Sequence, residues 1–283
     1  MATILVTGGN IGNLVAEELA SRSFAVRVLA KTVKQNPKWE KAKIEQIAVD
    51  MASIPSMLPA FEGVDRFFSV TPFVENLAEL GVNTIQAAKQ AGVRRIVRSS
   101  FIGASESWIA LGRAHKAVEQ AVEASGIPYT ILRPNTFMQS YAMNSLSIKS
   151  DSAFYMPQGE GRVSLVDVRD VAALAVAVLT QEGHERRIYD VTGAEALSNN
   201  DVADKLSLTL GKQVHYVDVS AAQAEQSMRD AGLPAWMVSS LLELFQFSKR
   251  GDAAHVSDSI NKILSRSPLT FEQFLQDNRE LFS

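Results

Sequence analysis

Short apolar runs alternate with amphipathic stretches through the first half of the chain. The runs predict six strands, over residues 3–7, 25–30, 44–49, 64–71, 95–99 and 129–133. One helix is expected from about Asn76, a good N-cap, to Ala91. The clearest helical spacing ends before Gly126 and joins Ala114, Ala117, Val118, Ala121 and Val122. This alternation predicts an α/β fold whose parallel sheet is covered on both faces.

The second half has a different pattern and predicts a smaller α/β lobe. Residues 171–179 are apolar nearly all round, which indicates a buried helix directly after Asp167-Val168-Arg169-Asp170. Strands are expected over 188–192 and 214–218. Further helices are predicted to begin at Pro234 and at three capping pairs, which are Ser198 with Asp201, Ser220 with Gln223, and Thr270 with Gln273.

A glycine-rich turn directly follows the first strand. A strand, a glycine turn and a helix in this order point backbone N–H groups at a pyrophosphate. The common fingerprint places five steps between its first and last glycine, whereas Gly8 and Gly12 are four apart. The alternative is a structural turn that needs glycine for steric reasons alone. The residues expected to bind the phosphates are Thr7, Gly8, Gly9, Asn10, Ile11 and Gly12.

The end of the second strand favours NADP(H) over NAD(H). An acidic residue usually accepts hydrogen bonds from the ribose 2′-OH of NAD at this point. Here the chain reads Leu29-Ala30-Lys31, with Lys34 close behind, so a cation is available for a 2′-phosphate. The alternative is that both lysines belong to a solvated loop.

The ends of three further strands supply other candidate cofactor contacts. Asp50 could accept from the adenine amino group, or it could be a turn residue. Thr71-Pro72 ends the fourth strand with a rigid turn expected to lie along the cofactor. Ser99-Ser100-Phe101 ends the fifth strand, near the expected nicotinamide.

Composition excludes several classes of function. A chain of 283 residues, 46% of them hydrophobic, can bury a sizeable core, and a net charge of −3 argues against a nucleic-acid partner. The absence of cysteine excludes disulfides, cysteine-based zinc sites and thiol nucleophiles. With four histidines and no cluster around them, no metal is expected. Neither a signal peptide nor a membrane span is predicted, so we expect a cytoplasmic protein.

Several motifs together resemble the NmrA-like, atypical short-chain dehydrogenase/reductase family, including its quinone-, azo-dye- and triphenylmethane-reducing members. The resemblance covers nearly the whole chain and rests on Val6-Thr7-Gly8, the segments 91–97 (AGVRRIV), 125–134 (SGIPYTILRP) and 135–139 (NTFMQ), Gly159-Glu160-Gly161, and the segments 166–172 (VDVRDVA) and 189–193 (YDVTG). It implies a Rossmann-type, doubly wound parallel sheet that binds NAD(P)H. Residues 1–150 are expected to form the cofactor-binding region and 151–283 a substrate-side lobe, interleaved in one NmrA-like domain.

The glycine turn departs from the family pattern, which is usually T-G-x-T-G-x-x-G. Two residues are missing between Gly8 and Gly9. Two residues span at most about 7 Å of extended chain, and their loss removes backbone donors. The departure predicts weakened cofactor binding on an otherwise preserved fold.

The tyrosine–lysine pair of typical short-chain dehydrogenases, Y-x-x-x-K, is also incomplete, because Gly112 stands four residues before Lys116. No phenol is placed to protonate an alkoxide, which favours quinones, azo bonds and cationic dyes over carbonyl substrates. His115 and Lys116 are the candidate catalytic residues. Alternatively, His115 and Glu119 form a surface pair four residues apart on one helix.

A flat hydrophobic acceptor would suit a pocket of aromatic and methionine side chains. Its expected lining is Trp108, Phe137, Met138 and Tyr141, with Phe101, His115, Tyr155 and Met156 as further candidates. For each of them the alternative role is packing in the core.

The sequence therefore favours an NAD(P)H-dependent oxidoreductase that passes hydride to a quinone, an azo compound or a similar small hydrophobic acceptor. The first alternative is a redox-sensing regulatory protein that binds NADP(H) and a protein partner without turnover. The second is a relative whose shortened turn impairs cofactor binding.

Overall fold

The computed structural model describes residues 2–283, which form two compact units. The first unit comprises residues 2–105, Gly112–Arg133 and Val171–Asp190. The second comprises Glu106–Leu111, Pro134–Asp170 and Val191–Ser283. Each unit therefore draws on separate parts of the sequence.

A seven-stranded sheet with the order β3-β2-β1-β4-β5-β6-β8 forms the centre of the first unit. Neighbouring strands from β3 across to β6 pair in parallel, for example with Val6 opposite Val28 on one side and Phe68 on the other. The strand order reverses between β1 and β4. The strands are β1 (Thr3–Thr7), β2 (Ala25–Ala30), β3 (Glu45–Ala48), β4 (Arg66–Ser69), β5 (Arg95–Ser99), β6 (Tyr129–Pro134) and β8 (Arg187–Val191).

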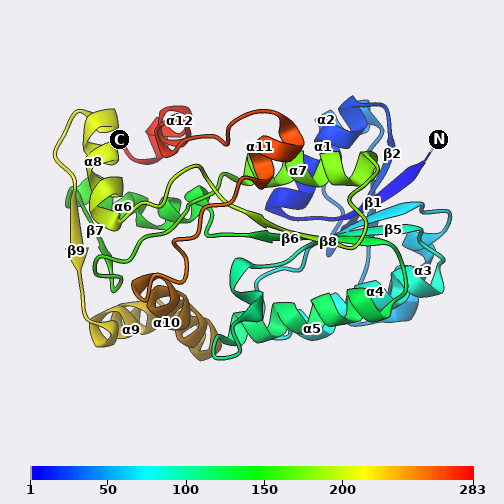
Figure 1. Cartoon of the computed structure of the whole chain (residues 1–283), viewed down its shortest axis with the longest axis horizontal. Coiled ribbons are helices and arrows are strands. Elements are labelled where there is room, and N and C mark those ends of the chain that lie inside the picture. Colours follow the sequence, from blue (N-terminus) through cyan, green and yellow to red (C-terminus); the bar gives the residue numbers. More distant parts are fainter. Residues whose placement is uncertain (1) are drawn as a thin grey trace. The chain divides into compact units, whose positions relative to one another are not determined.

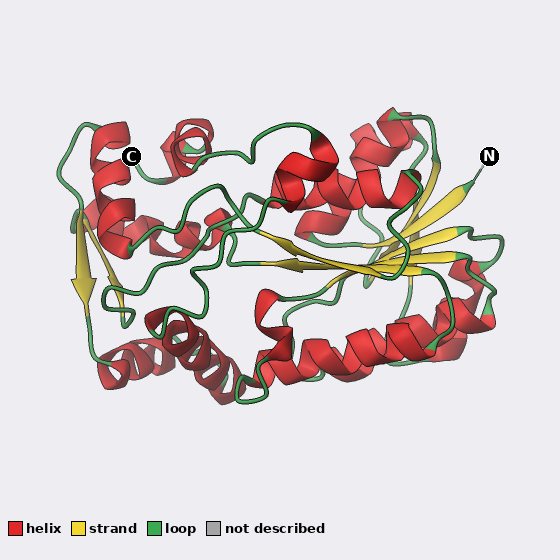
Figure 2. Cartoon of the chain, in the orientation of Figure 1, coloured by secondary structure: helices red, strands yellow, loops and turns green. Residues whose placement is uncertain are grey.

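Helices cover both faces of this sheet, with α1, α2 and α7 on one face and α3, α4 and α5 on the other (Figures 1 and 2). The central strands are buried on both sides, since Ile4, Leu5 and Val6 are all fully inaccessible. The elements are α1 (Asn10–Ser21), α2 (Pro37–Ala42), α3 (Ile54–Phe61), α4 (Leu77–Gln90), η1 (Ile102–Ser105), α5 (Ala110–Ala124) and α7 (Val168–Thr180).

The second unit has a small parallel sheet of two strands and a core rich in aromatic rings. Tyr141 packs edge-on against Phe154 and Phe271, and Phe274 continues the cluster to Phe282. Its elements are η2 (Met138–Asn144), α6 (Ser145–Ser150), β7 (Ala153–Met156), α8 (Asn199–Leu210), β9 (His215–Asp218), α9 (Ala221–Asp230), α10 (Ala235–Lys249), α11 (Ser259–Leu264), α12 (Phe271–Asp277) and η3 (Arg279–Leu281).

Most of the predicted elements are confirmed. All eight predicted strands are present within two residues at either end, and the three capping boxes of α8, α9 and α12 form as expected. Residues 171–179 form the buried middle of α7. The role of Asn76 needs correction, because it occupies the N-cap position of α4 but its side chain donates to Glu79 instead of accepting from the helix.

The sequence pattern missed β7 and several short helices, namely α2, α3, α6 and α11. Four residues are too few for a strand to show its alternation, and β7 depends on pairing with β9, which lies far along the chain. No helix in the described chain is both long enough and apolar enough to cross a membrane.

Candidate cofactor-binding site

A cavity of about 690 Å³ opens in the first unit at the carboxyl ends of β1, β2, β3 and β4. Parallel sheets bind ligands where the strand order reverses, which is the position between β1 and β4 here. Its size is typical of a pocket for an organic ligand. The lining residues are Thr7, Gly8, Gly9, Asn13, Val28, Leu29, Ala30, Lys31, Thr32, Lys34, Gln35, Asn36, Trp39, Gln46, Val49, Met51, Pro72 and Val74.

The glycine turn is held close to the sheet at the carboxyl end of β1. The Gly8 amide donates to the Leu29 carbonyl at 2.8 Å, which ties the turn to β2. Gly9 has a φ of 127°, a conformation that residues with a side chain rarely adopt. A Cβ at Gly12 would lie 1.9 Å from the Thr7 carbonyl oxygen. The turn therefore needs glycine at both of these positions for steric reasons.

The first turn of α1 leaves its backbone donors free. The N–H groups of Asn10, Ile11 and Gly12 donate no hydrogen bond within the described chain, and the helix has no acidic residue in its first turn. Unsatisfied N–H groups at the positive end of a helix favour an anion. Asn10, Ile11 and Gly12 do not line the cavity themselves, but they directly follow Gly9, which does.

The loop after β2 makes the cavity electropositive. Lys31 and Lys34 line the cavity, and no aspartate or glutamate of the described chain does so. The side chain of Gln46 holds the loop by accepting from the Lys34 amide at 3.2 Å and donating to its carbonyl at 2.7 Å. Asn36 then begins α2 by accepting from the amides of Lys38 and Trp39. The loop is therefore held in place and carries two positive charges, an arrangement that fits a phosphate group of a ligand.

The remaining candidate cofactor residues lie outside the lining of this cavity, except Pro72. The Asp50 carboxylate accepts from the Ala52 amide at 2.9 Å, which corresponds to the alternative of a turn residue. Thr71 accepts a hydrogen bond from Arg98, and Ser100 donates one to Glu119. Ser99 is buried and Phe101 lies near the ring of His115, with 6.1 Å between the ring centroids.

A buried arginine organises the carboxyl ends of β4 and β5. Arg98 is fully inaccessible and donates to the hydroxyl groups of Thr71, at 2.9 Å, and Ser69, at 3.3 Å. A guanidinium nitrogen lies 3.3 Å from Nδ1 of His115. Because arginine can only donate, Nδ1 of His115 accepts, and the imidazole proton is on Nε2. Burial lowers the pKa of Arg98 to about 9.

His115 is a neutral imidazole in this environment. Burial, and after it the positive charge of Arg98, lowers the pKa of His115 well below its usual range. It can donate a hydrogen bond from Nε2 but is a poor source of a proton at neutral pH. The catalytic assignment of His115 stays a prediction, and its neutral form favours positioning over proton donation.

Glu119 binds Arg133, Ser100 and Lys116, so the alternative of a surface pair between Glu119 and His115 is wrong. Glu119 is fully buried and accepts both prongs of Arg133, at 2.8 and 2.7 Å, and the Ser100 hydroxyl at 2.7 Å. Lys116 approaches it at 3.3 Å. Burial raises the pKa of Glu119, but the hydrogen bonds from Arg133 and Ser100 outweigh this effect and lower it overall. Lys116 is therefore engaged by a carboxylate.

The four expected substrate-pocket residues lie in the second unit. Met138 and Tyr141 are buried, and the Tyr141 hydroxyl donates to Asn199 at 2.7 Å, which corresponds to the alternative of core packing. Trp108 lies under the guanidinium of Arg250, with 4.8 Å from its carbon to the ring centroid. Phe137 forms an isolated parallel bridge with Val166.

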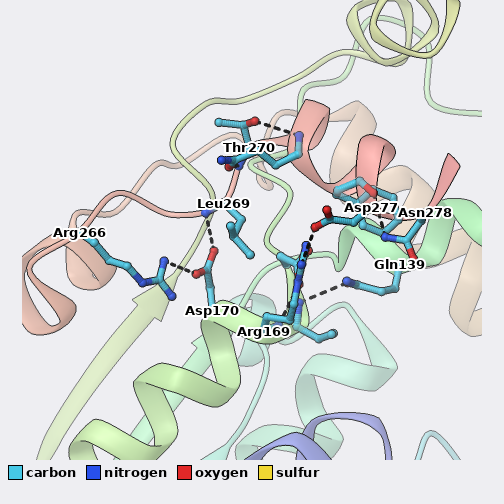
Figure 3. Close-up of polar contacts among 12 residues, drawn as sticks. Gln139, Arg169, Asp170, Arg266, Leu269, Thr270, Asp277 and Asn278 are labelled. Carbon is cyan, nitrogen blue, oxygen red and sulfur yellow. Dashed lines mark hydrogen bonds and ion pairs between the residues drawn. The ribbon is translucent and has the colours of Figure 1, made fainter. Parts of the chain in front are cut away.

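A second polar cluster in this unit surrounds the start of α7 (Figure 3). Asp167 and Asp170 are fully buried, and Arg169 pairs with Asp167 at 2.8 Å and with Asp277 at 2.6 Å. Asp170 accepts from the Leu269 amide at 2.7 Å and pairs with Arg266 at 2.6 Å. Within residues 2–283, no group of three or more histidine, cysteine, aspartate or glutamate residues has the arrangement of a metal site.

Three known proteins of similar sequence or structure carry NAD(P)H, NADPH or NADP(H) in their names or structures. An NAD(P)H azoreductase of Xenophilus azovorans is 36% identical over 282 residues, which cover 99% of each chain. The NADPH complex of an NADPH-dependent quinone oxidoreductase from Escherichia coli is 25% identical, with a TM-score of 0.87 over 98% of this chain and 99% of that chain. The NADP(H) complex of Citrobacter sp. triphenylmethane reductase is 27% identical, with the same TM-score and the same coverage.

A model of the NmrA-like family matches residues 1–275, which agrees with the parallel sheet, the glycine turn and the position of the cavity. On this evidence the chain belongs to the NmrA-like family.

Proposed function

We propose that this protein is an NADPH-preferring reductase that passes hydride to a quinone, an azo compound or a similar hydrophobic acceptor. The observation that carries the proposal is the cavity at the strand ends, which is lined by the glycine turn before α1 and by two lysines and has no acidic residue of the described chain in its lining. The names of the azoreductase and the quinone oxidoreductase support the acceptor class. The reduced nicotinamide supplies the hydride when it is bound.

The preference for NADPH follows from the charges around the loop after β2. An NAD-specific site usually presents a carboxylate to the ribose hydroxyl groups, and such a carboxylate would repel a 2′-phosphate. In this cavity Lys31 and Lys34 take its place, with Thr32 between them. The relatives with NADPH or NADP(H) in their structures support this choice.

The residues at the ends of β5 and α5 favour an acceptor that needs no protein acid. His115 is neutral, Lys116 is paired with Glu119, and Gly112 stands where a tyrosine would protonate an alkoxide. Reduced quinones and azo groups delocalise their charge and can take a proton from water. We assign His115 the role of a hydrogen-bond donor that orients the acceptor, and Lys116 that of a positioning residue acting through Glu119.

The test is oxidation of NADPH followed at its near-ultraviolet absorbance with a panel of quinones, azo dyes and triphenylmethane dyes. We expect turnover with at least one class, and faster turnover with NADPH than with NADH. Tight NADPH binding without turnover of any acceptor would instead favour the redox-sensing alternative, in which the cofactor changes affinity for a protein partner.

A further inference from the structure

Two of the N–H groups in the glycine turn are already bound within the protein. The Gly8 amide donates to the Leu29 carbonyl at 2.8 Å, and the Gly9 amide donates to the side-chain oxygen of Asn13 at 3.2 Å. The Asn13 amide in turn donates to the Gly9 carbonyl at 2.8 Å. Asn13 is therefore attached to Gly9 through both its backbone and its side chain.

The orientation of the Asn13 carboxamide follows from this contact. A backbone N–H needs an acceptor, so the oxygen faces Gly9 and the NH₂ group points away from it. Asn13 is exposed and lines the cavity, and its NH₂ group has no partner in the described chain. The hydrogen bond from Gly9 polarises the carboxamide and strengthens the NH₂ group as a donor.

We propose that the Asn13 carboxamide replaces the backbone donors that the shortened turn lacks, and that it binds the pyrophosphate of the dinucleotide. The inference rests on the proposed function. The turn has two residues fewer than the T-G-x-T-G-x-x-G pattern, and the Gly9 amide is bound to the Asn13 side chain. The Asn13 oxygen accepts from the Gly9 amide, and the two N–H bonds of the carboxamide are left to donate to a ligand in the cavity. The same side chain stabilises the turn and extends its reach toward the ligand.

Two substitutions separate these roles. In Asn13→Asp the carboxylate still accepts from the Gly9 amide, but the donors are replaced by a negative charge. In Asn13→Ala both contacts are lost. Because hydrogen bonds to a charged phosphate are strong, Asn13→Ala should weaken NADPH binding by at least about tenfold and Asn13→Asp more than that.

The control ligand is adenosine 2′-phosphate, which carries the 2′-phosphate but no pyrophosphate. Its affinity, measured by calorimetry, should be unchanged in both variants, and thermal melting should show that both fold. Asn261→Asp is the matched charge control, because Asn261 is exposed on α11 in the second unit and outside the cavity lining. It should leave the NADPH affinity unchanged.

A longer turn provides the second test. Inserting alanine and threonine between Gly8 and Gly9 restores backbone donors, so Asn13→Ala should cost less than about twofold in NADPH affinity on that background. Unchanged NADPH affinity of Asn13→Asp, or an equal loss for both ligands, would overturn the role of Asn13 while the proposed function stands. A native chain that binds neither NADPH nor adenosine 2′-phosphate would overturn the proposed function itself.

Discussion

The starts of α1 and α7 meet the same physical requirement in opposite ways. Both helices leave N–H groups without intrahelical partners, as every α-helix does. At α7, Asp167 accepts from the Arg169 amide at 2.8 Å, and the Gln139 side chain accepts from the Val168 amide at 3.2 Å. At α1, the Asn13 side chain accepts from the Gly9 amide of the turn, and no side chain of the described chain caps the helix.

The difference shows which helix end is available to a ligand. Buried carboxylates neutralise the positive end of α7, and arginine side chains in turn pair with those carboxylates, so this cluster holds loops of the second unit together (Figure 3). The start of α1 has neither acids nor a side chain that caps the helix, and it directly follows Gly8 and Gly9, which line a cavity with two lysines. A fully satisfied helix end indicates structure, whereas an unsatisfied one beside a cavity indicates an anion site.

The largest effect is expected from Gly12→Val. Its side chain would collide with the Thr7 carbonyl oxygen, which a Cβ alone would approach to 1.9 Å. Forcing α1 away from β1 should lower the free energy of unfolding by about 3 kcal/mol and abolish NADPH binding. Urea denaturation and fluorescence titration check the two effects. Wild-type NADPH affinity in this variant would contradict the close approach of the helix to the turn.

The matched change at α7 is Asp170→Ala. It leaves the Leu269 amide without its acceptor and removes the partner of Arg266, and should lower the free energy of unfolding by about 2 kcal/mol. NADPH affinity should stay at the wild-type value, because this cluster is structural. A loss of NADPH binding comparable to that of Gly12→Val would remove the distinction between the two helix ends.

The buried polar residues Arg98, His115 and Glu119 of the first unit should make the free energy of unfolding depend on pH. Burial and Arg98 lower the pKa of folded His115 below its usual value of about 6.5, so the unfolded state takes up a proton first as the pH falls. Stability should therefore decline below pH 6.5, by about 1.4 kcal/mol per pH unit, until the folded imidazole also titrates.

His115→Asn keeps an acceptor for Arg98 without a titrating group, and should flatten this decline in urea denaturation measured from pH 7 to pH 5. Glu119, whose pKa is lowered, contributes its own loss of stability only at more acidic pH, as the pH falls below the usual glutamate range toward its folded pKa. An unchanged slope in His115→Asn would show that another group is responsible.

The smallest effect is expected from Lys31→Ala. Loss of one exposed cation from the cavity should weaken NADPH binding about tenfold and leave NADH binding unchanged, because NADH has no 2′-phosphate. Lys38→Ala is the matched control, since Lys38 is also exposed but lies outside the cavity lining. Equal losses for the two cofactors would indicate that Lys31 does not contact the 2′-phosphate.

Local signals made much of the fold predictable. The apolar runs of the central strands and the capping boxes at Ser198, Ser220 and Thr270 are encoded within a few residues, and the structure confirms them. The glycine turn is local in the same way. Asn36 followed by Pro37 is also a local helix start, and it marks the beginning of α2 in the sequence.

The polar contacts of the site depend on residues distant in the sequence and could not be predicted in this way. Arg98 stands out as a charge in an apolar strand, but its partners Ser69 and Thr71 come from the neighbouring strand end. Glu119 and Arg133 meet because α5 packs beside β6, which reverses the expectation of a surface residue. The role of Asn13 depends on the geometry of the shortened turn.

The most direct test of the account is a fluorescence titration of the native chain with NADPH, with NADH alongside. The free donors of α1 and the two lysines predict saturable binding of NADPH in the micromolar range, about −8 kcal/mol, and weaker binding of NADH. Absence of NADPH binding at millimolar concentration would contradict the claim that the start of α1 is a phosphate site.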